Sequence, residues 1–432
     1  MLLSPDFSLD EYEVSLQNGF LPDAPLQALE DAYYAPWENI AEDLTARIQA
    51  RTLRQAVDNL PVLSTSRLQS EPQWRRAYVV LAYLTHAYVW GGERPSDVLP
   101  PAISVPFLEV SSHLELPPCA TYAALNLWNF STVSPNGDLA CPDNLSVTLS
   151  YTGTKDEEWF FMISVAIEAR GGQIIQLMLD TLYAVSVDDK QRVAAYLNQI
   201  SEGFQEVARI LERMYEKCRP SVFFHQLRPY LAGSKNMASA GLPSGLFYDL
   251  GEEKGEWRQY SGGSNAQSSL IQTFDIFLGV EHSATGNPTK AEISKSQPLA
   301  KNPYIQEMRN YMPGPHRRFL EMLTRNSNVR AYAMGCKLDT PVRDAYNTAV
   351  MSLGAFRDKH IQIVTRYIIR AAKLPPPDNT PAQLNIATTT YTQMKGSGEK
   401  VSEGLSGTGG TDLIPFLKQT RDTTKAAASY AD

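Results

Sequence analysis

Long apolar runs are missing from this 432-residue chain. No stretch of about 18 consecutive apolar residues occurs, so the sequence predicts no membrane-spanning helix. The first ten residues lack a basic segment followed by an apolar one, so we predict no secretory signal. Cysteine is scarce, with four scattered residues and no C-x-x-C spacing, which is typical of reduced cytosolic thiols rather than a disulfide framework or a zinc site. We therefore expect a cytoplasmic protein.

Positive charge is also in short supply. The formal net charge is -8, the sequence pI is near 5.4, and no dense run of Lys and Arg interrupts that average. This balance argues against nucleic acid or an anionic membrane as a partner. The composition, 43% hydrophobic and 20% charged, is typical of a globular protein, and a chain of this length can form two packed units.

Common catalytic and metal-binding motifs are absent. The sequence has no H-E-x-x-H, no Walker A and no G-x-S-x-G motif. The glycine-rich segment 404–410 follows no predicted strand and lacks the G-x-G-x-x-G spacing, which favours a flexible loop over a dinucleotide site. Its six histidines, at positions 86, 113, 225, 282, 316 and 360, show no pairing at i+3 or i+4. A metal centre built from several histidines is therefore not expected.

Helical periodicity dominates what is present. Apolar residues recur at steps of three and four and predict helices over residues 29–48, 74–90, 157–187, 193–214, 223–231, 268–280, 304–323, 340–372 and 412–428. Residues 92–150 are rich in Pro, Gly, Ser and Asn, and predict loop with at most a hairpin near 146–151. Gly171-Gly172 indicates a bend or a close-packing point in its helix.

These elements predict an all-α fold in three parts. We expect a smaller, mainly helical N-terminal domain over residues 1–150 with a loop-rich end, and a large helical domain over 151–373. Residues 374–432 are expected to form a mobile loop, followed by a C-terminal helix that packs on the large domain. The polar segment 281–302 predicts an exposed loop.

His360 stands on the apolar face of the last long helix. That face consists of Tyr346, Val350, Leu353, Arg357, His360, Val364 and Tyr367. A histidine on an apolar stripe is either a satisfied core residue, which is the commoner case, or a ligand held in a dry pocket. One histidine cannot hold a bare divalent metal tightly, but it can hold haem iron, because the porphyrin supplies four other ligands. His360 is thus compatible with a proximal haem ligand, and both interpretations stay open.

Aromatic and basic residues form a second candidate group. Residues 159–161 (Trp-Phe-Phe) and 223–224 (Phe-Phe) predict apolar walls, and Arg228 shares a helix face with Phe224 four residues earlier. An inward arginine needs an anion, and its planar fork suits a carboxylate or a propionate. The alternative is a buried ion pair, for which Asp275 is available. The residues alone leave both alternatives open.

Several stretches in order along residues 10–430 together resemble the indoleamine 2,3-dioxygenase family. They are Leu114–Tyr122, Phe160–Ser164, Phe223–Arg228, Gly262–Ser269 with Phe274-Asp275, Arg309–Phe319, His360–Ile368 and Gly407–Leu413. The resemblance implies an all-α enzyme whose large domain binds one haem b per chain. It also implies that this enzyme opens the indole ring of tryptophan.

The resemblance also assigns roles to residues. It implies that His360 is the proximal ligand of the haem iron and that Arg228 binds the substrate carboxylate. The candidate catalytic residues are Ser164, Phe223 and Arg228. The candidate substrate-binding residues are Tyr122, Phe160, Phe223, Phe224, Arg228, Ser264 and Thr408, the last in a mobile loop over the pocket. The candidate haem-binding residues are His360, Ser264, Asp275 and Arg357.

The implied reaction inserts both atoms of O2 across the indole C2–C3 bond of L-tryptophan and gives N-formylkynurenine. This is the first step of the kynurenine pathway, which leads to NAD. We expect a monomer, with a cellular reductant that keeps the iron ferrous. The alternative is a haem-binding paralogue with weak tryptophan activity and a sensing or other redox role.

The chain also departs from the animal members of the family. Leu125, Asn126 and Asn265 differ from the animal pattern and would alter the size of the pocket. The segment 281–302 is longer than in the animal enzymes.

Overall fold

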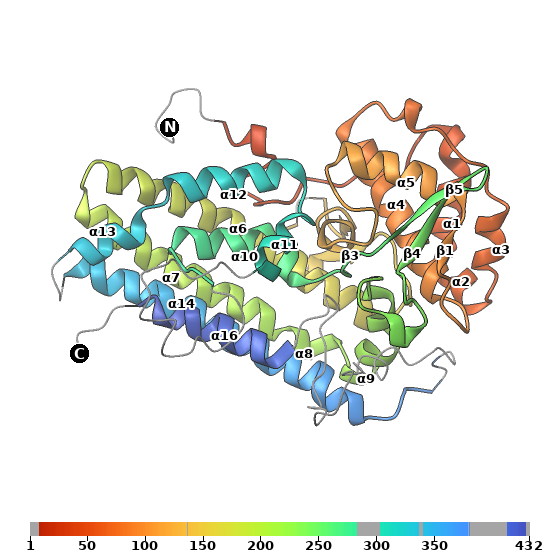
Figure 1. Ribbon diagram of the computed structural model, residues 1–432. Helices are drawn as coiled ribbons and strands as arrows, with labels where there is room; N and C mark the ends of the chain where they lie inside the picture. The colour runs from red at the N-terminus through yellow and green to blue at the C-terminus, as the bar shows by residue number, and fades with distance from the viewer. Residues whose placement is uncertain are drawn as a thin grey trace.

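The computed structural model describes residues 8–135, 137–282, 303–336, 340–378, 380 and 413–428. Thr408, the loop predicted over residues 396–410 and nearly all of segment 281–302 lie outside the described residues. Helices dominate the described chain, as predicted (Figure 1). None of the described helices combines the length and the apolar character that crossing a membrane requires.

The N-terminal part is a cluster of helices around α4 (Figure 1, orange). Its α-helices are α1 (Ala35–Glu42), α2 (Leu44–Gln49), α3 (Leu53–Asp58), α4 (Glu71–Trp90) and α5 (Pro101–His113). Every side chain of α4 from Arg76 to Trp90 is buried, so this helix is the core of the N-terminal part. The helix predicted over 29–48 is interrupted, because α1 ends at Glu42 and α2 begins at Leu44.

Helix α5 corrects the prediction of loop over residues 92–150. Pro101 occupies the first helical position, where a missing N–H does no harm, and Ile103, Phe107 and Val110 form the buried face. The Pro-rich and Gly-rich flanks obscured this short apolar pattern.

Two small sheets accompany the helices. Strand β2 (Phe130–Thr132) pairs antiparallel with β3 (Leu145–Val147), close to the predicted hairpin. The other sheet has the order β1-β4-β5, from β1 (Val98–Leu99), β4 (Leu246–Gly251) and β5 (Lys254–Arg258). Strand β4 runs parallel to β1 and antiparallel to β5, with Leu246 opposite Arg258. The β4–β5 hairpin was not predicted, and it attaches a segment from the middle of the chain to the N-terminal helices (Figure 1).

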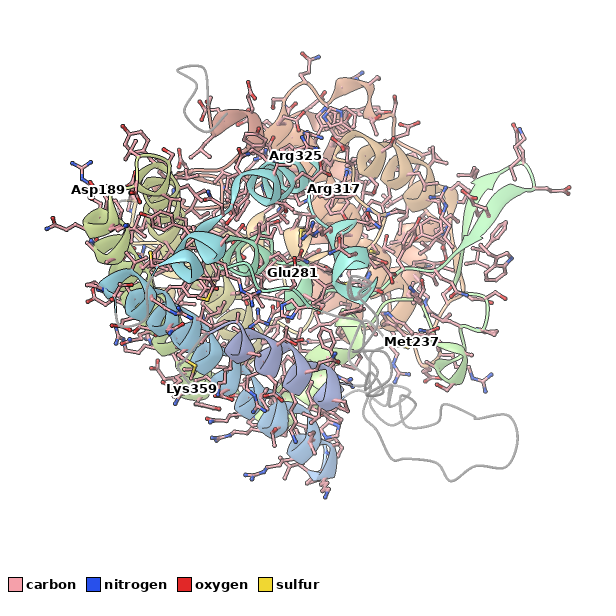
Figure 2. All side chains as sticks on the ribbon, turned by 60° about the vertical axis from the view of Figure 1, so that its left-hand side comes forward. Asp189, Met237, Glu281, Arg317, Arg325 and Lys359 are labelled. Carbon is pink, nitrogen blue, oxygen red and sulfur yellow. The ribbon has the colours of Figure 1, made fainter. Side chains whose placement is uncertain are left out.

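Long helices form the remainder of the molecule. They are α6 (Lys155–Ser186), α7 (Lys190–Glu212), α8 (Met214–Lys217), α9 (Pro220–Val222), α10 (Ser269–Phe277), α11 (Pro303–Arg309), α12 (Gly314–Asn326), α13 (Val329–Gly335), α14 (Pro341–Val364) and α16 (Leu413–Ala426). Helices α6 and α14 both pack along α7, and α16 lies along α14 (Figure 1). Charged side chains such as Asp189, Arg325 and Lys359 project from the outer surface of this group (Figure 2). Helix α16 agrees with the helix predicted over residues 412–428 within two residues at each end.

Gly171-Gly172 is a close-packing point and not a break, because α6 continues through both residues. A Cβ atom on Gly172 would lie 2.4 Å from the backbone nitrogen of Gly19, and one on Gly171 would lie 2.3 Å from the Leu270 side chain. Glycine is needed here because α10 and the N-terminal segment approach the backbone of α6 too closely for a side chain.

Two further predicted helices are also not single α-helices. The helix predicted over 304–323 is divided into α11 and α12, because Pro313 lacks an N–H and disfavours helical backbone in the residue before it. The helix predicted over 340–372 is α-helical to Val364, π-helical over Thr365–Arg370 and 3-10 helical over Ala371–Lys373. The register of His360 is unaffected, because it precedes the change.

Candidate active site

One cavity collects most of the residues predicted from the sequence. It is lined by Tyr122, Phe160, Ser164, Phe223, Arg228, Ser264, Asp275, Arg357 and His360. The cavity has a volume of about 250 Å³, whereas a single water molecule needs only about 10–15 Å³. The space therefore suits organic ligands. Segments far apart in the sequence, from the N-terminal part, α6, α10 and α14, meet at this place.

Two predicted residues are not part of this lining. Phe224 is buried behind the wall, where it packs against Ala371, and the Arg228 guanidinium lies 5.5 Å from the centre of its ring. Phe224 therefore packs beside Arg228 and does not line the cavity. Thr408 lies outside the described residues, so its predicted contact with substrate stays a prediction.

Three π-helical turns border the cavity. They are Ala123–Leu127, Phe223–Leu227 and Thr365–Arg370, and each contributes or adjoins lining residues. A π-turn inserts one residue into a helix, which changes the direction of the side chains that follow, and such turns are frequent at functional sites. The turn over 223–227 is followed at once by Arg228, so the local irregularity brings both Phe223 and Arg228 to the cavity wall.

The His360 side chain faces the cavity from α14 and has no hydrogen-bond partner among the described residues. Burial, reinforced by the positive charge of Arg357, lowers its pKa to about 4. The imidazole is therefore neutral at physiological pH, and the neutral form is the one that ligates metals. No group of three or more His, Cys, Asp or Glu residues suited to a metal ion occurs in the described part of the chain. A single histidine of this kind fits an iron whose other ligands come from a porphyrin.

His86 shows what a satisfied buried histidine looks like in this molecule. Its Nε2 atom accepts the backbone N–H of Ala120 at 3.0 Å, so its Nδ1 atom carries the proton and donates to the carbonyl of Tyr230 at 2.7 Å. Both nitrogens of His86 are thus engaged by the protein. His360 differs in this respect, which favours the ligand interpretation over the core interpretation.

A charged cluster adjoins His360. Arg357, one turn earlier on α14, donates to both carboxylate oxygens of Asp275 at 2.6 and 2.7 Å, and His282 Nε2 lies 3.0 Å from Asp275 Oδ2. Burial raises the pKa of Asp275, but Arg357 and His282 outweigh that effect and hold the pKa below its ordinary value. Asp275 is therefore ionised and paired with Arg357. The alternative pair with Arg228 is not what forms.

Arg228 is a buried cation in the cavity wall, with 5% of its surface exposed. Burial lowers its pKa to about 10, so it stays charged at neutral pH. A charged guanidinium beside an apolar space is well placed to bind a ligand carboxylate, because such a bond is strong when water is excluded.

An aromatic group forms the apolar wall. The rings of Phe160 and Phe223 lie 4.8 Å apart at 45°, and Phe223 meets Tyr367 edge-on at 5.8 Å. The Tyr367 hydroxyl is fixed by bonds to the carbonyls of Met214 and Cys218 at 3.1 and 2.6 Å. This wall offers flat, apolar surfaces of the kind that pack against an indole ring.

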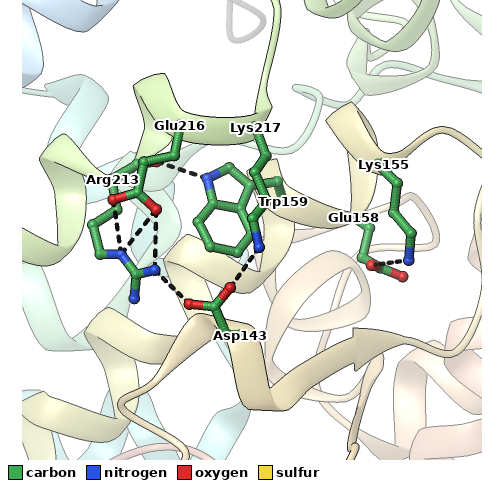
Figure 3. A network of polar contacts seen from close by, with 7 residues as sticks. All are labelled: Asp143, Lys155, Glu158, Trp159, Arg213, Glu216 and Lys217. Atoms are coloured by element: carbon green, nitrogen blue, oxygen red, sulfur yellow. Dashed lines mark hydrogen bonds and ion pairs between the residues drawn. The ribbon is translucent and has the colours of Figure 1, made fainter.

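Outside the cavity, a polar network fixes the beginning of α6 (Figure 3). Asp143 bonds to Arg213 and Lys217, each at 2.5 Å, and the indole N–H of Trp159 donates to the carbonyl of Arg213 at 2.7 Å. Lys217 Nζ lies 4.1 Å from the centre of the Trp159 ring. Since Trp159 is anchored on this side, its neighbour Phe160 is held against the cavity.

Sequence reasoning missed two parts of the site. Helices α11 and α16 close one wall with Tyr304, Ile305, Phe416, Leu417 and Thr420. Helix α16 is attached to α14 through Asp358, which pairs with Arg421 at 3.2 Å and Lys425 at 2.6 Å. The other missed part is Glu168, a fully buried carboxyl behind the wall that contacts Tyr122 and Ser268. A glutamate inside the apolar stretch of α6 was the available signal.

The family model described as indoleamine 2,3-dioxygenase matches residues 8–427. The chain belongs to this family. It is 43% identical over 444 residues to an indoleamine 2,3-dioxygenase of Aspergillus nanangensis, with 99% of this chain and 98% of the relative covered. It is 39% identical to the Saccharomyces cerevisiae indoleamine 2,3-dioxygenase, with 97% and 93% covered. It is also 36% identical to a 6-hydroxytryptophan 2,3-dioxygenase of Fusarium equiseti, with 96% of both chains covered.

The resemblance and the helical fold predicted from the sequence are thereby confirmed. The chain is an oxidoreductase of a family of haem dioxygenases, and it acts on an indole substrate with O2. The roles of individual residues stay predictions, and we develop them below.

Proposed function

We propose that the chain binds one haem b through His360 and adds both atoms of O2 across the C2–C3 bond of L-tryptophan, giving N-formylkynurenine. The observation that supports this most strongly is that a neutral imidazole without a protein partner in the described part of the chain and a buried guanidinium line the same apolar cavity. The imidazole suits the iron, and the guanidinium suits the amino-acid carboxylate of the substrate.

The chain's own residues then bind, orient and exclude water. Bound haem supplies the activation of O2. His360 would hold the iron through its neutral imidazole, and Ser264 and the Asp275–Arg357 pair line the same cavity. Arg228 holds the carboxylate, and the rings of Phe160 and Phe223 restrict the indole to one plane. Ser164 is a hydrogen-bonding accessory. No strong base is needed, because the apolar walls serve orientation and exclusion of water.

A ring-hydroxylated tryptophan is the second candidate substrate, and Asn126 favours it. Its Nδ2 atom donates to the Tyr122 carbonyl at 3.3 Å, which fixes the orientation of the amide. Its Oδ1 atom is buried and has no partner within the described residues, although Asn126 lines the cavity. A hydroxyl on the indole ring could satisfy this acceptor. The relative named for 6-hydroxytryptophan shows that the family includes such activity.

The decisive experiment is product formation by the purified, haem-loaded protein. A Soret band should appear with haem, and L-tryptophan should give N-formylkynurenine under aerobic, reducing conditions. Parallel assays with 6-hydroxytryptophan rank the two substrates, and Asn126→Val should lower kcat/KM for the hydroxylated substrate more than for tryptophan. A Soret band without product from either substrate would support the haem-binding paralogue of weak activity. Failure to bind haem would overturn the proposal.

A further inference from the structure

His282 is a buried histidine to which the proposed function gives no role. Only 7% of its side-chain surface is exposed, and it does not line the cavity. Its Nε2 atom lies 3.0 Å from Oδ2 of Asp275, which does line the cavity. Its Nδ1 atom is buried and has no partner among the described residues. Within that part of the chain, His282 is therefore connected to the site through the carboxylate of Asp275.

The backbone after α10 turns back on itself and brings His282 to Asp275. The N–H of Val280 donates to the backbone carbonyl of Asp275 at 2.9 Å. Gly279 has a φ of 64°, in the left-handed region that favours glycine. Arg330 of α13 fixes this turn from outside, since its Nη1 atom donates to the Gly279 carbonyl at 3.1 Å. The position of His282 beside Asp275 is thus built into the fold.

The bond between His282 and Asp275 has a defined direction. Nη2 of Arg357 donates to both oxygens of the carboxyl, at 2.6 and 2.7 Å. A guanidinium can only donate, and its positive charge favours the ionised carboxylate, which can only accept. Nε2 of His282 must therefore carry a proton and donate it to Oδ2. Asp275 is held by two donors, one from Arg357 and one from His282.

Arg357 does not use all of its donors on Asp275. Both bonds come from Nη2, whereas Nε is buried and has no partner in the part of the chain that the structure describes. Arg357 lines the cavity from α14, one turn before His360. A buried guanidinium N–H needs an acceptor, and anions are the acceptors that it binds most strongly. The propionates of haem are anions of this kind.

We propose that His282 is a positioning residue for the haem propionates. By fixing the carboxylate of Asp275, it holds the Arg357 guanidinium at Nη2 and leaves the Nε–H for a propionate. His282 itself touches neither haem nor substrate. This inference rests on the proposed function, because it takes haem as an occupant of the cavity. Without the bond from His282, the carboxylate would be free to turn about its side chain, and Arg357 would turn with it.

The test compares two porphyrins loaded into the protein. One is haem b, and the other is its dimethyl ester, whose propionates carry no charge. Transfer to an excess of apomyoglobin measures the rate at which each porphyrin is lost. His282→Leu removes the donor, so it should accelerate the loss of haem b about two- to thirteenfold, the equivalent of one neutral hydrogen bond. The loss of the dimethyl ester should change by less than about twofold, because an uncharged ester gains little from Arg357.

A rescue and a mutant cycle distinguish this role from a merely structural one. His282→Gln retains an N–H donor, so the rate of haem loss should stay within about twofold of the wild type. Arg357→Leu should itself accelerate the loss of haem b, because it removes the guanidinium. In that background, His282→Leu should add less than about twofold, because its effect passes through Arg357.

His113 offers a matched control in the N-terminal part. Its Nε2 atom lies 2.6 Å from a carboxylate oxygen of Glu71, so it too is a histidine beside a carboxylate, and neither residue lines the cavity. His113→Leu should leave the loss of both porphyrins unchanged. This control separates the removal of any histidine–carboxylate contact from the removal of the one beside the cavity.

The outcomes distinguish two failures. A wild type that retains no haem would defeat the proposed function before any variant is made. If the wild type retains haem, and His282→Leu accelerates the loss of both porphyrins equally or of neither, the positioning role is overturned. An equal effect of His282→Leu with and without Arg357→Leu would overturn it as well. Rapid loss of haem b from His282→Gln would do the same, because that variant keeps the donor.

Discussion

The two buried glutamates of α6, Glu157 and Glu168, lie in different surroundings. At the beginning of the helix, Glu157 accepts bonds from the backbone N–H groups of Tyr151 and Thr152 and from the hydroxyls of Ser150 and Thr152. Three turns later, Glu168 is equally buried but has one oxygen without a partner among the described residues. The difference lies in these two side chains: both oxygens of Glu157 accept hydrogen bonds where α6 begins, whereas Glu168 keeps one oxygen unsatisfied behind the cavity wall.

The largest effect, on haem binding, should come from substituting His360. His360 has no hydrogen-bond partner among the described residues, whereas both ring nitrogens of His86 are bonded. His360→Ala should abolish stable haem binding, because no other residue that lines the cavity in the described part of the chain is a histidine. His86→Ala is the matched variant, since His86 is fully engaged by Ala120 and Tyr230. It should bind haem but melt at a lower temperature. Soret absorbance per chain measures the difference, and normal haem content in His360→Ala would refute the proximal assignment.

Arg228→Ala should have the next largest effect, on catalysis rather than on haem content. A charge-assisted hydrogen bond contributes about 1.5–3 kcal/mol, so kcat/KM for L-tryptophan should fall about tenfold or more. Tryptamine, which lacks the carboxylate, should lose much less. Arg209→Ala, at an exposed arginine of α7, is the control and should stay within about twofold. An equal loss for tryptophan and tryptamine would make Arg228 a structural residue.

Replacing each glutamate by glutamine should have opposite effects on the free energy of unfolding at pH 8. The pKa of Glu168 is raised by burial to about 7, so the native state prefers the protonated form. Stability is then highest below the ordinary pKa near 4.5 and falls as pH rises through about 7. Glu168→Gln avoids this loss, which amounts to about 3 kcal/mol from the pKa difference. It should therefore be more stable than the wild type at pH 8.

Glu157→Gln should instead be less stable than the wild type at pH 8. Its amide nitrogen would face donors that now bond to a carboxylate oxygen, and an unsatisfied buried donor costs about 1–3 kcal/mol. Denaturant unfolding at pH 5 and pH 8 measures both variants. Burial raises the pKa of Glu157 as well, so the two variants are distinguished by the sign of the change in unfolding free energy at pH 8. The comparison fails if both variants change that free energy in the same direction.

These contrasts also explain how much the sequence could predict. The inward position of His360 was predicted from helical periodicity alone. Arg228 was predicted to share a helix face with Phe224, but the π-turn over 223–227 intervenes, and only Arg228 lines the cavity. Glu168 was missed because its partners Tyr122 and Ser268 come from positions 46 and 100 residues away. Periodicity of 3.6 residues cannot reveal the three π-turns, since each breaks that period. Strand β4 depends on pairing with β1 across the chain, which no local pattern records.

The smallest expected effect belongs to Ser164, which lines the cavity. Ser164→Ala should retain substantial activity, because it removes one neutral hydrogen bond of about 0.5–1.5 kcal/mol, a two- to thirteenfold effect on rate. Phe223→Ala should be more damaging, because Phe223 packs against both Phe160 and Tyr367, and its loss opens the aromatic wall. The comparison is made at saturating tryptophan with haem content normalised. A general base typically contributes about 100- to 10,000-fold. A loss beyond about a hundredfold in Ser164→Ala would therefore turn that hydroxyl into a proton-transfer group, and the cavity could no longer be described as one that works by orientation alone.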